Sequence, residues 1–220
     1  MMHDWGIDEA QFLRHDAKRG RRHAYLSVDP LRTALIVIDM VPFFLNENPY
    51  CRGIVPNIER MANGLREAGG VVAWVLPGKE PPTAVKEEFF GVEVAKLYSE
   101  SGGEGPLIDR LWHELTVSKE DLLVEKTAAS AFFPGRCDLP KLLKGRGIDT
   151  VLIAGTVANV CCESSARDAS TLGYRTIMLA DANAAVRDAD LNATLHTIYR
   201  TFGDVRTTSE ILDLLVASER

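Results

Sequence analysis

Long apolar runs are missing from the sequence. A transmembrane helix needs about 20 consecutive, mostly apolar residues, and no stretch approaches that length. The first thirty residues also lack the uninterrupted apolar segment of a signal peptide, because the arginine pair at 21–22 is followed by Asp29 rather than by a hydrophobic region. We therefore expect a cytoplasmic protein that has no membrane partner.

Positive charge is in the minority. The 25 lysines and arginines stand against 31 aspartates and glutamates, which leaves a formal net charge of -6. Nucleic-acid binding depends mainly on cationic contacts to phosphate, so this balance argues against a nucleic-acid partner. One basic cluster, at residues 18–22, is short. We interpret it as a solvated segment, with a subunit or substrate contact as the alternative.

Cysteine is also scarce, with four residues at positions 51, 137, 161 and 162. These cysteines have neither the spacing of a metal site nor the density of a disulfide framework, and a reducing compartment would keep them as thiols. An isolated free cysteine is usually a small buried hydrophobic residue. A reactive role for any of the four therefore needs local evidence.

What the sequence does contain is an ordinary globular composition, 46% hydrophobic and 25% charged over 220 residues. Apolar runs predict six strands, at residues 33–39, 71–76, 121–126, 149–155, 175–181 and 204–208. The stretches between them predict helices at 57–70, at 139–148, from about 161 to 172, around 188–201, and from 209 onward. This alternation predicts an α/β fold of three αβα layers, with a mostly parallel six-stranded sheet between helices.

The same pattern predicts the domain organisation. We expect an N-terminal extension over residues 1–30, which either wraps a partner subunit or borders a pocket, and a single domain over 31–220. Residues 77–120 form a long connection between the second and third strands, which we interpret as a cover segment. Its stretch SGGEG, at 101–105, lacks the preceding strand and the following Lys-Ser/Thr of a phosphate loop. We interpret that stretch as a flexible connector and expect no cofactor.

Three reactive side chains stand at the carboxyl ends of predicted strands, where ligands bind in open parallel sheets. Asp39 ends the first strand, Lys126 ends the third, and Cys161 follows the fourth after a short loop. Asp39 and Lys126 also have purely structural interpretations. An acid that ends a buried strand is often a helix cap or a partner for a backbone N–H, and a lysine after a strand is usually solvated. The adjacent Cys162 points about 100° away around a helix, and we interpret it as a packing residue.

Together, the three side chains would form a nucleophilic site. A helix N-terminus aimed at Cys161 would lower the pKa of its thiol from ~8.5 and populate the thiolate. Asp39 could accept the thiol proton, while Lys126 holds both anions and steadies the charge that develops during attack. Backbone N–H groups near Val157 and at Cys161 could form an oxyanion hole.

Five segments in register resemble the isochorismatase-like cysteine hydrolase superfamily, whose members include nicotinamidases, N-carbamoylsarcosine amidases, ureidoacrylate and biuret hydrolases, and isochorismatases. The segments are TALIVIDMVPFF at 33–44, VEKTAASAFF at 124–133, VLIAGTVANVCCESSARDA at 151–169, GYRTIMLADANAA at 173–185 and FGDVRTTSEIL at 202–212. The resemblance implies an isochorismatase-like hydrolase fold with Asp39, Lys126 and Cys161 as the catalytic triad. It also implies a cis peptide between Thr156 and Val157, which belongs to the oxyanion loop.

Two further comparisons with this superfamily narrow the chemistry. Nicotinamidases carry a metal site after the second strand, with an Asp and His pair in a DxH pattern, whereas the matching stretch WVLPGKEPP at 74–82 contains no histidine. We therefore expect no metal. Some isochorismatases hydrolyse a vinyl ether with the acid alone and lack the cysteine. The presence of Cys161 favours acyl chemistry at a C–N bond.

The resemblance thus implies a cysteine-dependent amidohydrolase. Its Cys161 thiolate would attack an amide, ureido or carbamoyl carbon, an amine or ammonia would leave, and water activated by Asp39 would hydrolyse the thioester. Two alternatives stay open. One is an isochorismatase-type ether hydrolase in which Asp39 protonates the substrate, and the other is a non-catalytic ligand-binding or assembly protein that keeps the fold.

The residues that set specificity are less well marked. Trp74, Phe132 and Phe133 stand beside strand ends and are candidate walls of a substrate pocket, with ordinary core aromatics as the alternative. Arg167 and Asp168 follow the cysteine in the predicted helix, and we expect them to secure the fold or subunit packing. Similar proteins are commonly dimers or tetramers, so we expect a homo-oligomer that acts on a small-molecule substrate.

Overall fold

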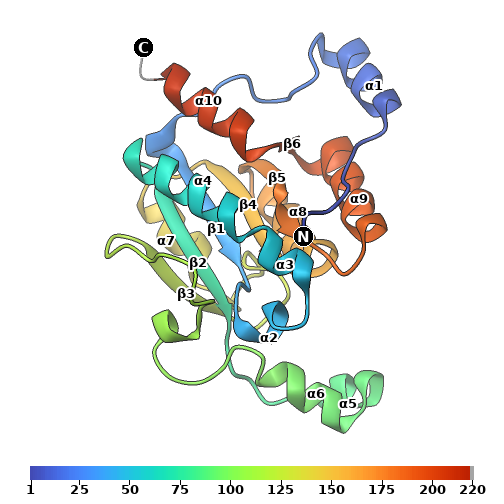
Figure 1. Cartoon of the computed structure of the whole chain (residues 1–220), viewed down its shortest axis with the longest axis vertical. Helices are drawn as coiled ribbons and strands as arrows, with labels where there is room; N and C mark the ends of the chain where they lie inside the picture. The colour runs from blue at the N-terminus through green and yellow to red at the C-terminus, as the bar shows by residue number, and fades with distance from the viewer. Residues whose placement is uncertain (219–220) are drawn as a thin grey trace.

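Six parallel strands form the middle layer of the computed structural model, which describes residues 1–218 (Figure 1). The strand order is β3-β2-β1-β4-β5-β6, and every neighbouring pair is parallel. The strands are β1 (Thr33–Ile38), β2 (Val71–Pro77), β3 (Leu122–Lys126), β4 (Thr150–Thr156), β5 (Arg175–Ala184) and β6 (Asp204–Arg206). The predicted α/β fold and its six strands are confirmed.

The two central strands, β1 and β4, are buried at every position. Continuous apolar runs of this kind are typical of a parallel sheet that is covered on both faces. The neighbouring β5 runs on to Ala184, beyond its predicted end at residue 181, because the pairing with β4 shifts register between Ile153 and Gly155. The amide of Asn183 donates to the backbone C=O groups of Ile153 and Leu179 at 2.8 and 2.7 Å, which satisfies the backbone at this irregularity.

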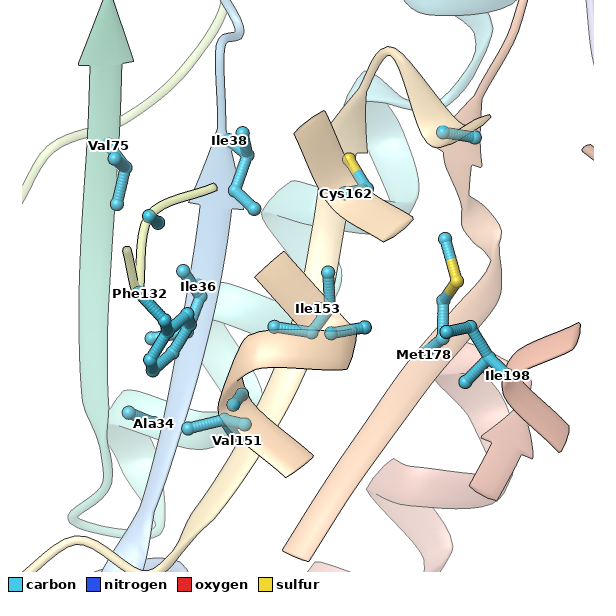
Figure 2. Close-up of a cluster of buried hydrophobic side chains, with 14 of the residues drawn as sticks. Ala34, Ile36, Ile38, Val75, Phe132, Val151, Ile153, Cys162, Met178 and Ile198 are labelled. Carbon is cyan, nitrogen blue, oxygen red and sulfur yellow. The ribbon is translucent and has the colours of Figure 1, made fainter. Parts of the chain in front are cut away.

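Helices cover both faces of the sheet and enclose two hydrophobic clusters. On one face lie α1 (Glu9–Arg19), α7 (Leu139–Gly145), α8 (Glu163–Thr171) and α9 (Asp188–Thr197), and Figure 2 shows part of the cluster beneath them. On the other lie α3 (Pro49–Gly53), α4 (Val55–Glu67) and α10 (Thr208–Ser218). The predicted helices are confirmed with shifted ends. No helix within residues 1–218 has the length and apolarity needed to cross a bilayer.

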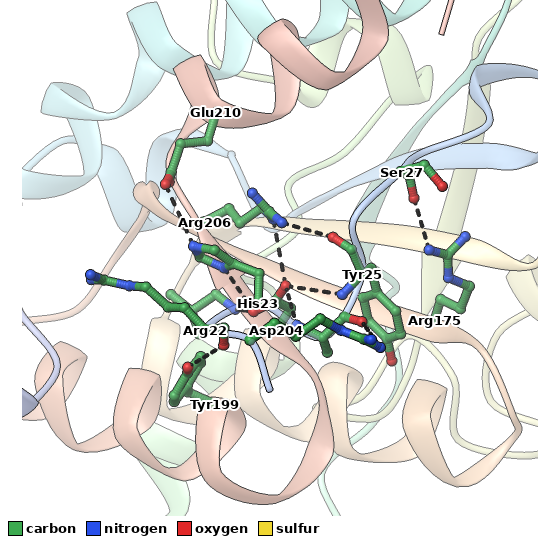
Figure 3. A network of polar contacts seen from close by, with 12 residues as sticks. Arg22, His23, Tyr25, Ser27, Arg175, Tyr199, Asp204, Arg206 and Glu210 are labelled. Atoms are coloured by element: carbon green, nitrogen blue, oxygen red, sulfur yellow. Dashed lines mark hydrogen bonds and ion pairs between the residues drawn. The ribbon is translucent and has the colours of Figure 1, made fainter. Parts of the chain in front are cut away.

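A buried carboxylate fastens the N-terminal extension to the sheet. Asp204, the first residue of β6, is fully buried and lies 3.1 Å from Nδ1 of His23 and 3.5 Å from Nε of Arg206 (Figure 3). It also accepts a hydrogen bond from the N–H of Ala24, and Arg206 donates to the C=O of Tyr25. The extension therefore packs against the domain of its own chain.

The cover segment contains two helices that the sequence analysis did not predict, α5 (Ala84–Phe90) and α6 (Val92–Ser99). They form a hairpin that projects from the body of the protein beyond the carboxyl ends of the strands (Figure 1). Most of their large apolar side chains are exposed. The sequence analysis missed these helices because they are only 7 and 8 residues long, too short for a periodic apolar pattern to identify them.

Arg110 holds the base of this hairpin. It lies in a short 3-10 helix, Leu107–Arg110, and its guanidinium donates to the C=O groups of Pro77 and Gly102 at 2.6 Å each. A third bond, of 2.7 Å, runs to the carboxylate of Glu125 in β3. The two ends of the hairpin are thus joined to each other and to the edge of the sheet.

Candidate active site

Asp39 occupies the turn directly after β1, at the carboxyl edge of the sheet. Its side chain is buried, and its backbone has a φ of 55°, which is unusual for a residue other than glycine. The Asp39 N–H donates to the C=O of Val75 at 2.8 Å and so fixes the turn to β2. The next helix, α2 (Pro42–Leu45), has Val41 as its N-cap residue. Asp39 is therefore not a helix cap, and its carboxylate faces the site.

Lys126 is the last residue of β3, and its side chain is buried rather than solvated. Its Nζ lies 2.8 Å from Oδ2 of Asp39 and 3.6 Å from Sγ of Cys161. The same ammonium donates to the C=O of Ala128 at 3.1 Å. Lys126 therefore bridges the acid and the thiol, and the structure brings together the three residues that the sequence analysis selected.

Cys161 lies in a π-helical turn, Ala158–Cys162, that runs directly into α8. The sequence analysis predicted that this helix begins near Cys161. The helical segment instead begins three residues earlier, at Ala158. Cys161 is partly exposed, whereas Cys162 is fully buried in the hydrophobic cluster on the same face of the sheet (Figure 2). The interpretation of Cys162 as a packing residue is confirmed.

The surroundings of Cys161 favour its thiol over the thiolate. Burial, followed by the charge of Asp39, raises the pKa of Cys161 to about 12 against the lowering effect of Lys126. The expectation that the helix N-terminus lowers this pKa is therefore wrong. The physical reason is that taking a thiolate out of water and placing it next to a carboxylate disfavours it by more than the nearby ammonium of Lys126 favours it.

Burial also shifts the two partners of the thiol. It raises the pKa of Asp39, although Lys126 and a hydrogen bond with Cys161 act in the opposite direction. It lowers the pKa of Lys126, but the charges of Asp39 and Cys161 outweigh burial and leave that pKa raised. Ionised Asp39 therefore disfavours a free thiolate at rest, but its carboxylate is in place to accept the thiol proton when that proton leaves.

The loop between β4 and Cys161 contains a cis peptide, between Thr156 and Val157, at the position that the family resemblance implies. Thr156 is fully buried, and its hydroxyl lies 3.1 Å from Sγ of Cys51. The preceding residue, Gly155, has a φ of 117°, a value that L side chains rarely adopt. Glycine at this position lets β4 reach the end of β1 and brings the loop next to Asp39.

Two of the three candidate pocket aromatics are core residues. Trp74 is fully buried in the cluster beneath α4 and α10, on the face of the sheet away from Cys162, and its indole N–H donates to Asp121 at 2.8 Å. Phe132 is 1% exposed and packs edge to face against Tyr174. Their assignment to the pocket is wrong, because closeness to a strand end does not say which face a side chain takes. Phe133 is 51% exposed and stays a candidate.

Ser165 is a positioning residue that the sequence analysis missed. It is fully buried, and its hydroxyl donates to the C=O of Cys161 at 2.7 Å while accepting from the N–H of Ala131 at 2.9 Å. It thereby ties the helical segment that contains Cys161 to the loop that follows Lys126. The available signal was its spacing, since a serine four residues after Cys161 can bond back to the C=O of that residue.

The helix after Cys161 is further secured by Arg167. Its guanidinium lies 2.5 Å from the carboxylate of Glu163, one turn earlier, and 4.6 Å from the centroid of the Phe202 ring. These contacts are within the chain, so Arg167 serves the fold. This is one of the two roles that the sequence analysis expected for it.

The arrangement supplies a nucleophile, a base and a cation within one largely buried cluster. Such a set can perform nucleophilic attack followed by acid-base catalysis. In the part of the chain that the structure describes, no group of three or more His, Cys, Asp and Glu side chains is placed to hold a metal ion.

The sequence is similar to a known protein family and to individual members of it. The family model of the isochorismatase domain matches residues 33–210. The isochorismatase family protein YwoC of Bacillus subtilis is 31% identical over 195 residues, which cover 86% of this chain and 96% of that protein. The ureidoacrylate amidohydrolase RutB of Agrobacterium fabrum is 27% identical, with 86% and 92% covered.

Solved structures show the same fold. A cysteine hydrolase from Pseudomonas syringae pv. phaseolicola superposes with a TM-score of 0.78 at 29% identity, covering 89% of this chain and 98% of that one. An N-carbamoylsarcosine amidase from Thermoplasma acidophilum superposes with a TM-score of 0.68 at 27% identity, covering 82% and 98%. The similarity therefore covers most of this chain and nearly the whole of each of the two solved chains.

Proposed function

The chain belongs to the isochorismatase family and is a hydrolase, and from this premise we propose that it is a cysteine-dependent amidohydrolase. Its substrate would be a small amide, ureido or carbamoyl compound, cleaved at a C–N bond through a thioester intermediate. The observation that carries this proposal is the position of the Lys126 ammonium, 2.8 Å from Asp39 and 3.6 Å from Cys161. Similarity to a ureidoacrylate amidohydrolase and an N-carbamoylsarcosine amidase supports the same bond type.

The first half of the reaction makes the thioester. Asp39 takes the proton of the Cys161 thiol, and Lys126 stabilises the resulting thiolate by its charge. The thiolate adds to the carbonyl carbon, and the developing oxyanion is bound by backbone N–H groups of the loop, near Val157 and at Cys161. Protonated Asp39 then gives its proton to the leaving nitrogen, and ammonia or an amine departs.

The second half releases the acid product. Ionised Asp39 removes a proton from a water molecule, which attacks the thioester carbonyl. Collapse of the second tetrahedral intermediate breaks the C–S bond, and the thiolate recovers the proton that Asp39 holds. The raised pKa of Asp39 suits this shuttle, because a carboxylate with a raised pKa is a stronger base toward the thiol and toward water than an ordinary aspartate.

A second candidate function also has an observation in its favour. Burial raises the pKa of Asp39, so this carboxyl is suited to protonate a vinyl ether substrate in the manner of an isochorismatase. In that reaction Asp39 acts as the acid and Cys161 is dispensable. A non-catalytic binding protein is disfavoured because such a protein has no need for a complete acid, base and nucleophile set.

The deciding experiment compares two adjacent cysteine variants. The native protein, Cys161→Ala and Cys162→Ala would be assayed for ammonia release from ureidoacrylate, N-carbamoylsarcosine, biuret and simple amides, and for hydrolysis of isochorismate. For the amidohydrolase, Cys161→Ala lowers kcat by about 10⁴-fold or more, while Cys162→Ala keeps it. Hydrolysis of isochorismate that survives in Cys161→Ala would instead establish the ether hydrolase.

A further inference from the structure

The first six residues, here called the N-terminal strap, lie beside α3 and α9 (Figure 1). The N–H of Gly6 donates to Asn192 of α9 at 2.9 Å, and the Asn192 amide donates back to the C=O of Asp4 at 3.2 Å. At the other end, Met1 packs so closely on α3 that a Cβ atom on Gly53 would stand 1.7 Å from the Met1 C=O oxygen. The strap is therefore fixed at both of its ends.

His3, in the middle of the strap, is 7% exposed and has three partners. Its Nδ1 lies 2.6 Å from the carboxylate of Asp188, and its Nε2 lies 3.1 Å from the N–H of Ala185. Its ring stacks on that of Tyr50 with the centroids 3.8 Å apart. The N–H of Ala185 can only donate, so Nε2 is the acceptor and the ring proton sits on Nδ1, facing Asp188.

The peptide that His3 holds leads directly to the oxyanion loop. Ala185 is gripped from both sides, because its N–H donates to His3 and its C=O accepts from the amide of Asn48 at 3.2 Å. The preceding residue, Ala184, pairs with Thr156 in the sheet, and its C=O lies 3.4 Å from the Thr156 hydroxyl. Thr156 is the first residue of the peptide that precedes Val157.

A second chain of contacts also links His3 to Thr156. Asn48, whose amide holds Ala185, caps α3 by accepting from the N–H groups of Tyr50 and Cys51 at 2.9 and 3.4 Å. The thiol of Cys51 lies 3.1 Å from the hydroxyl of Thr156. His3 is thus connected to Thr156 indirectly by two chains of contacts, one through the end of β5 and one through α3.

We propose that His3 is a positioning residue, which sets the oxyanion loop at Thr156–Val157 through Ala185 and α3. This inference rests on the proposed function, because the loop matters for rate only if an acyl carbon is attacked by Cys161. His3 itself does not touch the reacting atoms. Its requirement is chemical rather than steric: an acceptor must face the N–H of Ala185.

Two substitutions separate that requirement from simple loss of packing. Gln can present an oxygen where Nε2 of His3 lies, whereas Asn reaches only as far as Nδ1, so His3→Gln keeps an acceptor for Ala185 and His3→Asn does not. Both lose the ring that stacks on Tyr50. As a matched control, Asp8→Ala removes the N-cap bond to the N–H of Ala10 in the same extension and leaves His3 untouched.

Three measurements on the full-length variants test the inference. The first is kcat and KM for the best amide substrate, where His3→Asn is expected to lower kcat by about ten- to a hundredfold with KM changed less than about threefold. His3→Gln should recover most of that loss, and Asp8→Ala should keep the native kcat. The second is the rate of Cys161 alkylation by iodoacetamide, expected to be unchanged because this displacement needs no oxyanion site.

The third measurement is amide hydrogen exchange in the peptides that span residues 154–161 and 182–186. Exchange should be faster there in His3→Asn and close to native in His3→Gln. If His3→Asn failed to fold, Asp188→Ala would take its place, because it releases the ring to the other tautomer and Asp188 is 40% exposed. It should lower kcat in the same direction.

The outcomes separate the two proposals. Native kcat and native exchange in His3→Asn would overturn the positioning role, as would equal losses in His3→Asn, His3→Gln and Asp8→Ala. If the native protein hydrolysed none of the amides, the amidohydrolase proposal would fail. Faster exchange confined to 154–161 and 182–186 in His3→Asn would still support the coupling of His3 to the loop.

Discussion

Gly155 in β4 lies so close to Ile38 in β1 that a Cβ atom on residue 155 would stand 2.1 Å from the C=O oxygen of Ile38. We expect Gly155→Ala to cost more than about 3 kcal/mol of unfolding free energy, because it combines a backbone clash with an unfavourable positive φ. Urea denaturation would measure the loss. Any folded fraction should have low activity, since the strand end beside Asp39 must move.

Gly145→Ala is the matched control for that prediction. Gly145 ends α7, and a Cβ atom there would meet nothing within 4 Å. Alanine should therefore be neutral or stabilise the protein by up to about 1 kcal/mol. A loss at Gly145 as large as the loss at Gly155 would refute the explanation by close strand approach.

The reactivity of Cys161 should follow its raised pKa. With a pKa of about 12, alkylation by iodoacetamide should be slower than that of a free cysteine at pH 8 and should keep rising above pH 9, where a free thiol levels off. Mass spectrometry of the Cys161 peptide would measure the rate against pH. A plateau below pH 8 would contradict the expected burial of the thiolate.

Two variants should move that titration in opposite directions. The charge of Asp39 raises the pKa of Cys161 and the charge of Lys126 lowers it. Asp39→Asn should therefore speed alkylation at pH 8, and Lys126→Met should slow it. Shifts in the same direction for both variants would show that overall loosening of the site, rather than charge, controls the thiol.

Removal of Lys126 should also destabilise the fold in a pH-dependent way. At neutral pH, Lys126→Met leaves a buried carboxylate without its cation, which costs about 3–5 kcal/mol. The folded-state pKa of Asp39 is already raised and rises further without Lys126, so folding favours its protonated form. The stability that this proton confers is present at low pH and is lost as the pH rises through the folded-state pKa.

Urea unfolding at pH 4 and pH 7 would test this predicted direction of the pH dependence. The difference in unfolding free energy between native protein and Lys126→Met should be smaller at pH 4 than at pH 7. The double variant Asp39→Asn with Lys126→Met should recover most of the loss at pH 7, because no buried charge remains. If this difference in unfolding free energy were instead larger at pH 4 than at pH 7, the loss of stability would not come from an unpaired Asp39 carboxylate.

Loss of Arg110 should release the helical hairpin of the cover segment. Its guanidinium joins Pro77, Gly102 and Glu125, so Arg110→Ala should make Lys86 and Lys96 in the hairpin more accessible to trypsin by severalfold. Lys79→Ala is the control, because the Lys79–Glu104 ion pair is exposed and contributes little. Equal cleavage of both variants would contradict the idea that Arg110 holds the base of the hairpin.

Much of this architecture could be predicted because parallel sheets leave a clear pattern. Strands covered on both faces are continuous apolar runs, and β1 and β4 show this along their whole length. Since the carboxyl ends of such strands share one edge, Asp39, Lys126 and Cys161 could be selected before their distances were known.

The parts that could not be predicted depend on three-dimensional surroundings. Trp74 lies on the face of the sheet away from Cys162, and no local pattern states which face that is. The pKa of Cys161 follows from the amount of water that distant segments exclude, whereas a helix N-terminus is visible locally and suggested the wrong direction. His3 lies outside all of the matched motifs, and its partners come from α3, from the residue that follows β5, and from α9.

The position of Lys126 on an outer strand has a consequence for the behaviour of the protein in solution. β3 is the edge of the sheet, and Lys126 pairs with Pro77 on one side and through an antiparallel bridge with Cys137 on the other. The loop at 127–137 therefore shields the open edge at the carboxyl end of β3, where an exposed strand would invite pairing with another chain. Variants that loosen this loop should not only slow hydrolysis but also aggregate, so activity and resistance to aggregation depend on the same short segment.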